Sequence, residues 1–199
     1  MLDIAIFYTD IPVYDNDKKR VGAIPRISLG DYTPLTDTEQ QTLKSANANL
    51  SKESLSLFGT LLHQIGKRFF AAQLLLAYKE ATNPRAKREI YDRLLFLYPS
   101  TVPSFENIQQ EKQQFKSILN RHFTPEQQIQ MMIVLKAKHD QIKNARGNAS
   151  LDDEIFDRGI AECVQALRNI PQNKKSPLVR RLCIRGTHRG QLVNDYSRS

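Results

Sequence analysis

Residues 51–78 read SKESLSLFGTLLHQIGKRFFAAQLLLAY, and this stretch decides the fold class. Its apolar side chains recur at alternating spacings of three and four residues, which is the pattern of one face of an α-helix. The positions in this pattern are Leu55, Phe58, Leu62, Ile65, Phe69, Ala72 and Leu76. Further leucines and Tyr78 widen the apolar face. We therefore expect a long helix at the centre of a helical bundle.

Shorter helices are predicted on both sides of this stretch. A polar cluster that begins at Thr36 predicts a short surface helix before it. Residues that favour helix N-termini open the later segments, namely Asn83 with Pro84, Ser104, Thr124 with Pro125, and Ser150. Helix ends are marked by Pro99, Gly147 and Pro171. The sequence thus predicts a mainly α protein, a bundle of about five to six helices with short loops between antiparallel neighbours. A TPR-like or HEAT-like stack of helix pairs is the alternative, although the chain has no repeat of fixed length.

Residues 1–35 differ in composition from the helical part. The strings LDIAIFYT (2–9) and RVGAIPRISL (20–29) contain many β-branched and aromatic residues, and the polar string DNDKK separates them. This order predicts a short β-hairpin, with an extended arm as the alternative. Pro12 and Pro25 would confine such strands to sheet edges or end them. Because an isolated hairpin is only marginally stable, we expect it to pack on the helices.

The positive charge of the chain is concentrated at its C-terminal end. The formal net charge is +8, to which residues 174–199 contribute +6 and residues 1–173 only +2. A domain that binds nucleic acid with its whole surface is therefore not predicted. By composition, the chain divides into a hairpin or arm (1–35), a helical domain (36–171) and a basic C-terminal segment (172–199).

Three structures are compatible with SPLVRRLCIRGTHRGQLVNDYSRS, the string that ends the chain. The first is a mobile, solvated tail. The second is a short helix that Ser176 caps and Pro177 begins, and that docks through Leu178 and Leu182. In that helix an outward stripe is formed by Arg181, Arg185 and His188. The third is an edge strand within residues 178–185 that pairs with the N-terminal segment.

If this segment is ordered, its cations form a candidate binding surface. The candidate residues are Lys174, Lys175, Arg180, Arg181, Arg185, His188 and Arg189. Such a surface can bind RNA, DNA, anionic lipid or an acidic groove of another protein. No aromatic residue lies between the arginines before Tyr196, so a base-stacking platform is not predicted there.

The two cysteines differ in their surroundings. Cys163 lies on the apolar face of a predicted helix, where we expect a buried and inert thiol. Cys183 lies among arginines, which lower thiol pKa values, and His188 follows five residues later. A catalytic Cys–His pair requires a fold that brings the two side chains together with a third, orienting group. The local sequence secures neither, so no catalytic residue is assigned.

The histidines do not predict a metal site. His63 lies on the polar face of the long helix, where we expect an exposed side chain. His122 and His139 lie beside apolar faces, where a backbone partner at the edge of the core is expected. No two histidines have the i, i+4 spacing of a helical metal pair, so neither a metal nor another cofactor is predicted.

An acidic cluster opens the last long predicted helix. It consists of Asp152, Asp153, Glu154 and Asp157. Carboxylates in the first turn of a helix are stabilised by the helix dipole, so we assign these residues a capping role. Ser150 and Asp153 also have the spacing of a capping box. Because Asp153 and Asp157 are four residues apart, we expect them to form one exposed acidic patch.

Targeting and composition features bound the location of the protein. The N-terminus lacks the basic start and the long apolar run of a secretory signal, and no segment is long and apolar enough for a transmembrane helix. Two cysteines are too few for a disulfide framework. These features predict a cytoplasmic protein, with secretion by a signal-independent route as the alternative. The Gln-, Asn- and Lys-rich helices are typical of many bacterial proteins, including secreted effectors and their adaptors.

Three functions are compatible with these observations. The leading hypothesis is a non-enzymatic helical module, an adaptor or regulator that binds another protein. The second is binding to nucleic acid or to an anionic surface through the basic C-terminal segment. The third is an enzyme whose site is assembled from residues far apart in the sequence.

Overall fold

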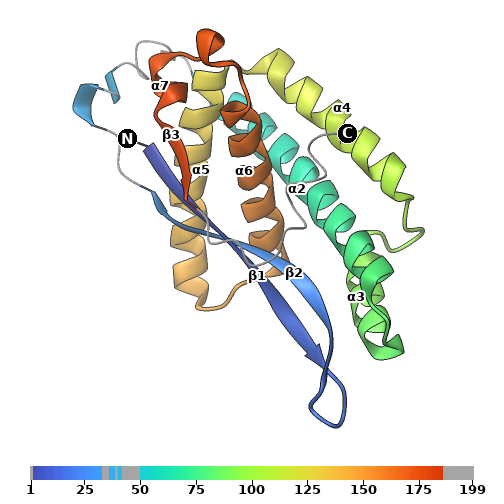
Figure 1. Cartoon of the computed structure of the whole chain (residues 1–199). Helices are drawn as coiled ribbons and strands as arrows, with labels where there is room; N and C mark the ends of the chain where they lie inside the picture. The colour runs from blue at the N-terminus through green and yellow to red at the C-terminus, as the bar shows by residue number, and fades with distance from the viewer. Residues whose placement is uncertain (1, 33–35, 39, 42–49, 186–199) are drawn as a thin grey trace.

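A computed structural model describes residues 2–32, 36–38, 40–41 and 50–185, and helices make up most of it (Figure 1). The long helices are α2 (Lys52–Glu80), α3 (Pro84–Leu97), α4 (Phe105–His122), α5 (Pro125–Arg146) and α6 (Leu151–Arg168). The strands are β1 (Leu2–Tyr14), β2 (Arg20–Tyr32) and β3 (Leu182–Arg185). The prediction of a mainly α fold with an N-terminal hairpin is confirmed. The short helix expected from Thr36 is exposed and helical in residues 37, 38, 40 and 41, and its remaining residues lie outside the described ranges.

Helix α2 lies at the centre of the bundle, as its wide apolar face predicts. It packs against α6, α4 and α3, and also against β2 and α5. Phe58, Leu62 and Ile65 of the predicted face are fully buried. Leu55 and Leu76, near the ends of this face, are half-buried. Each fully buried side chain of this size contributes about 1.5–3 kcal/mol relative to an exposed one.

Two glycines allow α2 and α6 to touch backbone to backbone. A Cβ atom on Gly66 of α2 would overlap the carbonyl oxygen of Ile155 and would lie 2.8 Å from the backbone nitrogen of Gly159. A Cβ atom on Gly159 of α6 would in turn overlap the carbonyl oxygen of Leu62. Neither contact involves a flexible side chain that can move aside. The crossing therefore requires glycine at both positions.

The predicted helix starts are confirmed by their hydrogen bonds. The side chains of the N-cap residues accept from backbone N–H groups in the first turn; these residues are Ser51, Asn83, Ser104, Thr124 and Ser150. Capping boxes form between Thr124 and Gln127 and between Ser150 and Asp153. Gly147 ends α5 with φ +82°, a conformation that favours glycine.

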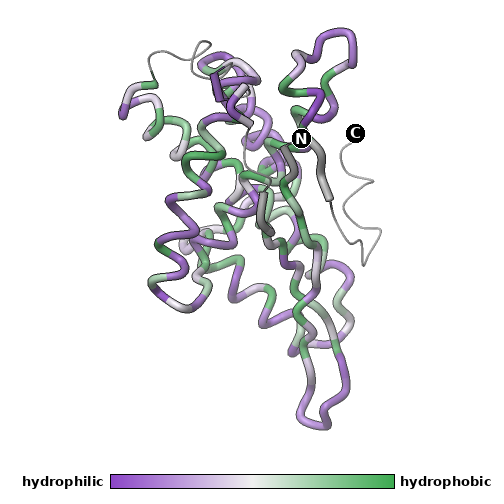
Figure 2. The backbone as a smooth tube through the Cα atoms, turned by 90° about the vertical axis from the view of Figure 1, so that its left-hand side faces the viewer, coloured by the Kyte–Doolittle hydropathy of each residue, from purple (hydrophilic) through white to green (hydrophobic). Residues whose placement is uncertain are grey.

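The N-terminal segment is a hairpin and not an extended arm. β1 pairs antiparallel with β2, and β3 pairs parallel with the start of β1, so the strand order is β2-β1-β3. Figure 2 shows the hairpin reaching past the helices to a hydrophilic tip. At this tip, Arg85 Nη1 donates to Asn16 Oδ1 (2.8 Å), which links the hairpin to the start of α3.

Both prolines lie inside the ladder without ending it. Pro25 is opposite Asp10, Pro12 is opposite Ala23, and the register has no shift between Ile6 and Val13. The carbonyl oxygen of Pro25 accepts from Arg158 of α6 (2.5 Å), so it points away from β1. Ladder hydrogen bonds alternate between opposed pairs, so Pro25 and Pro12 both occupy pairs that exchange none. Each missing N–H group thus faces a sheet edge, in agreement with the prediction.

The two halves of the hairpin pack on the helices through opposite faces of the ribbon. Ile6 and Ile27 belong to a core with the first half of α2, including Phe58. Val13 and Ile24 belong to a second core with the other half of α2, including Phe70. Ile6 and Val13 are an odd number of residues apart, so their side chains leave opposite faces of the ribbon. The ribbon therefore twists as it crosses the bundle.

The described part of the basic C-terminal segment is ordered and combines two of its three expected structures. Ser176 caps α7 (Pro177–Arg180), and β3 then pairs with β1 from Leu2–Leu182 to Ala5–Arg185. Leu178, Val179 and Leu182 are buried in the first core. A solvated tail is therefore excluded for residues 176–182, and residues 186–199 lie outside the described ranges.

In the parts of the chain that the structure describes, no helix combines the length and the apolar character that crossing a bilayer requires.

Candidate functional site

Four of the predicted anion-binding residues lie on ordered elements near the end of the described chain. Lys174 ends the 3-10 helix η1 (Gln172–Lys174), Lys175 follows it, Arg180 ends α7 and Arg181 follows α7. Lys174, Arg180 and Arg181 are exposed, and Lys175 is half-buried. Arg180 Nη2 donates to the carbonyl oxygen of Gln172 (3.2 Å), so this segment folds back on itself.

The predicted helical stripe of Arg181, Arg185 and His188 is wrong for Arg181 and Arg185. α7 ends at Arg180, and Arg185 lies in strand β3. The backbone of β1 offers pairing partners to residues 182–185, and this pairing replaces continuation of the helix. His188 and Arg189 lie outside the described residues.

The two cysteines lie in different elements. Cys163 of α6 is buried, and burial raises the pKa of its thiol to about 12, which confirms the expected inert side chain. Cys183 lies in β3, where its backbone is opposite Asp3. Its pairing with His188 falls outside the part of the chain that the structure describes, so that hypothesis stays untested.

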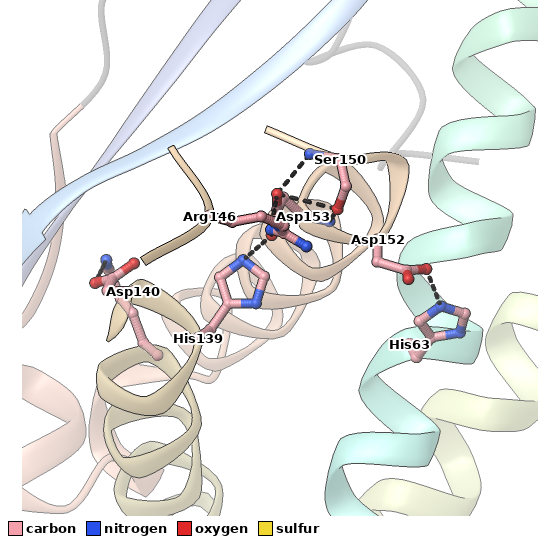
Figure 3. A network of polar contacts seen from close by, with 8 residues as sticks. His63, His139, Asp140, Arg146, Ser150, Asp152 and Asp153 are labelled. Atoms are coloured by element: carbon pink, nitrogen blue, oxygen red, sulfur yellow. Dashed lines mark hydrogen bonds and ion pairs between the residues drawn. The ribbon is translucent and has the colours of Figure 1, made fainter. Parts of the chain in front are cut away.

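Asp153 is the centre of a polar network at the start of α6 (Figure 3). It accepts from the N–H of Ser150 (2.5 Å) and from Nη2 of Arg146, whose distances to its two oxygens are 2.8 and 2.6 Å. Burial alone would raise the pKa of Asp153, but these hydrogen bonds outweigh burial and lower it. The network therefore anchors an ionised carboxylate that joins the end of α5 to the start of α6.

His139 of α5 also contacts Asp153 in this network, but the two side chains do not form a full ion pair. Its Nε2 atom lies 2.9 Å from Oδ1 of Asp153, but the contact lacks the geometry of a hydrogen bond. Its ring stacks on Phe156 with centroids 4.1 Å apart. Burial lowers the pKa of His139 although Asp153 opposes this, so the ring is neutral near pH 7. The expected core-edge position is confirmed, but its polar neighbour is a carboxylate instead of a backbone group.

His63 and His122 lie at the surface. His63 of α2 is partly exposed, as expected, with Nε2 3.6 Å from Oδ1 of Asp152 (Figure 3). His122 ends α4 and is exposed, so its expected position at the edge of the core is wrong. Over the described ranges, no group of three or more His, Cys, Asp and Glu side chains has the geometry to hold a metal ion.

The expected exposed acidic patch is wrong. Asp153 and Asp157 share a face of α6, but both side chains are buried. α5 packs on α6, so a polar face is not left to solvent. Burial raises the pKa of Asp157 to about 7, and the nearby lysines Lys143 and Lys136 offset only part of this effect.

Another buried charge of α6 is paired with lysines of α4. Glu162 lies 3.2 Å from Nζ of Lys112 and 3.0 Å from Nζ of Lys116. Burial alone would raise the pKa of Glu162, but the two ammonium groups outweigh it and lower the pKa. Lys112 also lies over the ring of Phe69 (5.2 Å to the centroid). These ion pairs link α4 to α6 and give the Glu162 carboxylate a structural role.

Arg158 of α6 is a buried cation for which the described residues offer no carboxylate partner within ion-pair distance. Its side chain is fully buried (0% exposed) and stacks on the ring of Phe70 at 3.7 Å. Nε donates to Gln73 Oε1 (3.0 Å), Nη2 donates to the Pro25 carbonyl, and Nη1 has no hydrogen-bond partner. Burial lowers the pKa of Arg158 to about 9. The guanidinium thus ties the hairpin to α2 and α6, with one donor unused.

A cleft of about 470 Å³ lies between the hairpin and the second half of α2. Both hydrogen-bond acceptors of Arg158, Gln73 and Pro25, line this cleft. Tyr8 also lines it and accepts from Gln165 Nε2 (2.8 Å). The volume is within the range of small-ligand and peptide sites. Sequence analysis did not predict this cleft, because it arises from contact between segments far apart in the chain.

The outer face of α3 exposes three large side chains among charged ones. α3 packs mainly on α2 and β2. Its outer side chains Tyr91, Leu95 and Phe96 are 42%, 36% and 72% exposed. Large apolar side chains that gather on one exposed face indicate an interaction site. The sequence contained a signal for this face: residues 94–97 are Leu-Leu-Phe-Leu, and four consecutive residues surround a helix, so one neighbour cannot bury them all.

The described site residues support structural roles better than catalysis. Asp153, Asp157 and Glu162 of α6 are buried in hydrogen bonds, in ion pairs or under α5, and the Cys163 thiol is inert. Besides the basic residues near the end of the described chain, the cleft and the outer face of α3 are surfaces open to a ligand among the described residues. Comparison with protein-family models, with curated proteins and with solved structures finds no match to this chain.

Proposed function

We propose that this protein is a non-enzymatic helical interaction module, an adaptor or regulator that binds another protein. The observation that carries this proposal is the exposure of three large side chains on the outer face of α3. Phe96 is 72% exposed, and Tyr91 and Leu95 extend the same face. Burying such side chains in an interface is favourable, and aromatic residues often dominate binding energies.

The surroundings of this face suit a protein partner. Arg88 and Asp92 are exposed among these side chains and form no ion pair with another described residue. Protein–protein interfaces combine aromatic and apolar contacts with polar groups in this way. The resemblance of the composition to bacterial effectors and their adaptors makes a signalling or effector complex the setting that we propose for this contact.

The experiment compares affinity purification of the wild-type protein and of the double variant Leu95→Ser/Phe96→Ser from cells that naturally make the protein. We expect a stoichiometric partner with the wild type and at least a tenfold loss with the variant, since truncating a central aromatic typically costs about 2 kcal/mol or more. Leu57→Ser removes a similarly exposed leucine from α2 and should retain the partner. Absence of a stoichiometric partner, or equal recovery with the double variant, would contradict the proposal.

A second candidate is binding to nucleic acid or to an anionic surface through the basic C-terminal segment. Its support is that Lys174, Lys175, Arg180 and Arg181 sit on or beside ordered elements and largely face solvent. We expect such binding to weaken steeply with salt, because phosphate contacts release counterions. Titration with an oligonucleotide and with anionic vesicles tests this. Lys174→Gln, Lys175→Gln and Arg180→Gln together should flatten the salt dependence, and an unchanged slope would reject this candidate.

A further inference from the structure

The cleft between the hairpin and α2 has a strand edge as one wall. Among the described strands, β2 is at the edge of the sheet, with β1 on its other side. The cleft is lined by Arg20, Val21, Gly22 and Ala23 in succession, and by Pro25 and Arg26. Tyr8, Thr9 and Asp10 of β1 line it as well, so consecutive residues of both strands, and the backbone of β2 among them, form this wall.

Ala23 directs hydrogen-bonding groups into this edge. The Pro25 carbonyl points away from β1 to reach Arg158. In an antiparallel pair, residues two apart direct their backbone groups to the same side. Ala23 therefore directs both its N–H and its C=O away from β1. No hydrogen bond from the described residues reaches these two groups. An unpaired edge of this kind is a template for another strand.

The opposite wall contains an apolar strip between polar residues. Leu76, Ala77 and Ala81, from α2 and its C-terminal end, form the strip, and Gln73, Glu80 and Thr82 also line this wall. Gly22 already packs closely on the start of α3, since a Cβ there would lie 2.6 Å from Cβ of Ala86. The hollow therefore exists because alanines stand where larger residues would fill it. In an extended segment every second side chain points to one face, so alternate apolar residues could enter this hollow.

Charged residues of both signs line the cleft, namely Arg20 and Arg26 together with Asp10 and Glu80. Arg26 makes no ion pair with the described residues. Its charge also acts on the buried guanidinium of Arg158, whose pKa it lowers. An acidic group of an occupant beside Arg26 would supply the carboxylate partner that this guanidinium lacks among the described residues.

We propose that this cleft binds an extended peptide segment of a partner protein, which adds a strand to the outer edge of β2 and places an acidic group beside Arg26. The segment donates to and accepts from Ala23, and its apolar side chains lie on α2. This inference rests on the proposed role as a protein-interaction module, and it adds a second surface that recognises extended peptide instead of a folded face.

The test is a selection of random peptides of about 12 residues, displayed on phage, against the purified wild-type protein, with synthesis of the enriched peptide. We expect enriched peptides to share an acidic residue beside alternating apolar residues. Fluorescence polarisation should give a dissociation constant that rises at least tenfold for Ala23→Pro, which removes the outward N–H. Losing one hydrogen bond of about 1.4 kcal/mol corresponds to that factor.

Matched variants keep this test decisive. Ala23→Ser retains the N–H and should bind as the wild type does. Ala77→Trp fills the hollow and Arg26→Glu reverses its charge, and both should weaken the peptide. Thermal unfolding identifies any variant that does not fold, in which case the remaining variants decide. A selection without enriched peptides, or equal affinity for Ala23→Pro, Ala77→Trp and the wild type, would overturn the proposal.

Failure of this proposal can be distinguished from failure of the proposed function. Leu95→Ser/Phe96→Ser should leave peptide affinity unchanged, because neither residue lines the cleft. Conversely, Ala77→Trp should retain a partner that binds the outer face of α3. Loss of peptide binding alone therefore leaves the α3 interface intact.

Discussion

Asp157 shows how a single buried carboxyl makes stability depend on pH. Its side chain is only 7% exposed, and no hydrogen bond or ion pair links it to another described residue. Burial raises its pKa from the ordinary 3.8 to about 7. The fold therefore favours the protonated form. The stabilisation from this proton is complete below about pH 4 and is lost as the pH rises through about 7.

We predict that Asp157→Asn removes this pH dependence. The amide stays neutral, so the variant should gain free energy of unfolding relative to the wild type as the pH rises from about 4 to 7. The gain should reach at most about 4 kcal/mol, since each pKa unit corresponds to about 1.4 kcal/mol. Urea denaturation of both proteins across this range measures the difference. A difference that is constant with pH would show that Asp157 is not a buried acid.

For single residues, the sequence predicts local roles such as helix capping, but it does not predict which polar side chains are buried. Ser150 and Asp153 were predicted as a capping box, because capping depends on residues three positions apart. The burial of Asp153 and Asp157 was not predicted. α6 packs against α2, α5 and the hairpin, so apolar spacing identified only one of its several buried faces. The network with His139 and Arg146 depends on the position of α5, which no local pattern specifies.

The close crossing of α2 and α6 is a property of two elements. We predict that Gly159→Ala lowers the free energy of unfolding by roughly 1–3 kcal/mol, because the new methyl group meets the backbone of Leu62 and forces the helices apart. Gly59→Ala in α2 is the matched control. Its Cβ would lie 3.7 Å from Leu135, an ordinary contact, and alanine favours helix by about 1 kcal/mol.

Urea denaturation at one pH measures both variants. The account expects Gly159→Ala to be less stable than the wild type and Gly59→Ala to be as stable or more stable. Equal stability of the two variants would show that the backbones do not touch at Gly159.

Element boundaries followed from the sequence, whereas element pairing did not. Caps and prolines set the starts of the long helices, since these signals act within one turn. The C-terminal segment remained ambiguous between helix and strand. β3 forms because residues 182–185 meet β1, which lies at the other end of the chain. Likewise, the crossing at Gly66 and Gly159 depends on two helices coming together, so helical spacing alone did not reveal it.

At the scale of the whole molecule, the candidate surfaces are well separated. α3 lies toward one end of the molecule, while α7 and β3 lie toward the other (Figure 1). The net positive charge is also unevenly distributed, because residues 174–199 contribute most of it and the rest of the chain is nearly neutral. A protein partner on α3 and an anionic ligand on the basic C-terminal segment would therefore not compete for the same surface.

Site-specific photocrosslinking tests the proposed interaction most directly. A photoreactive analogue of phenylalanine would replace Phe96 in cells that naturally make the protein, and the same analogue would replace the exposed Gln113 of α4 as a control. The account predicts a discrete crosslink to a second protein from position 96 and none from position 113. No product from position 96, or the same product from both positions, would contradict a partner interface on α3.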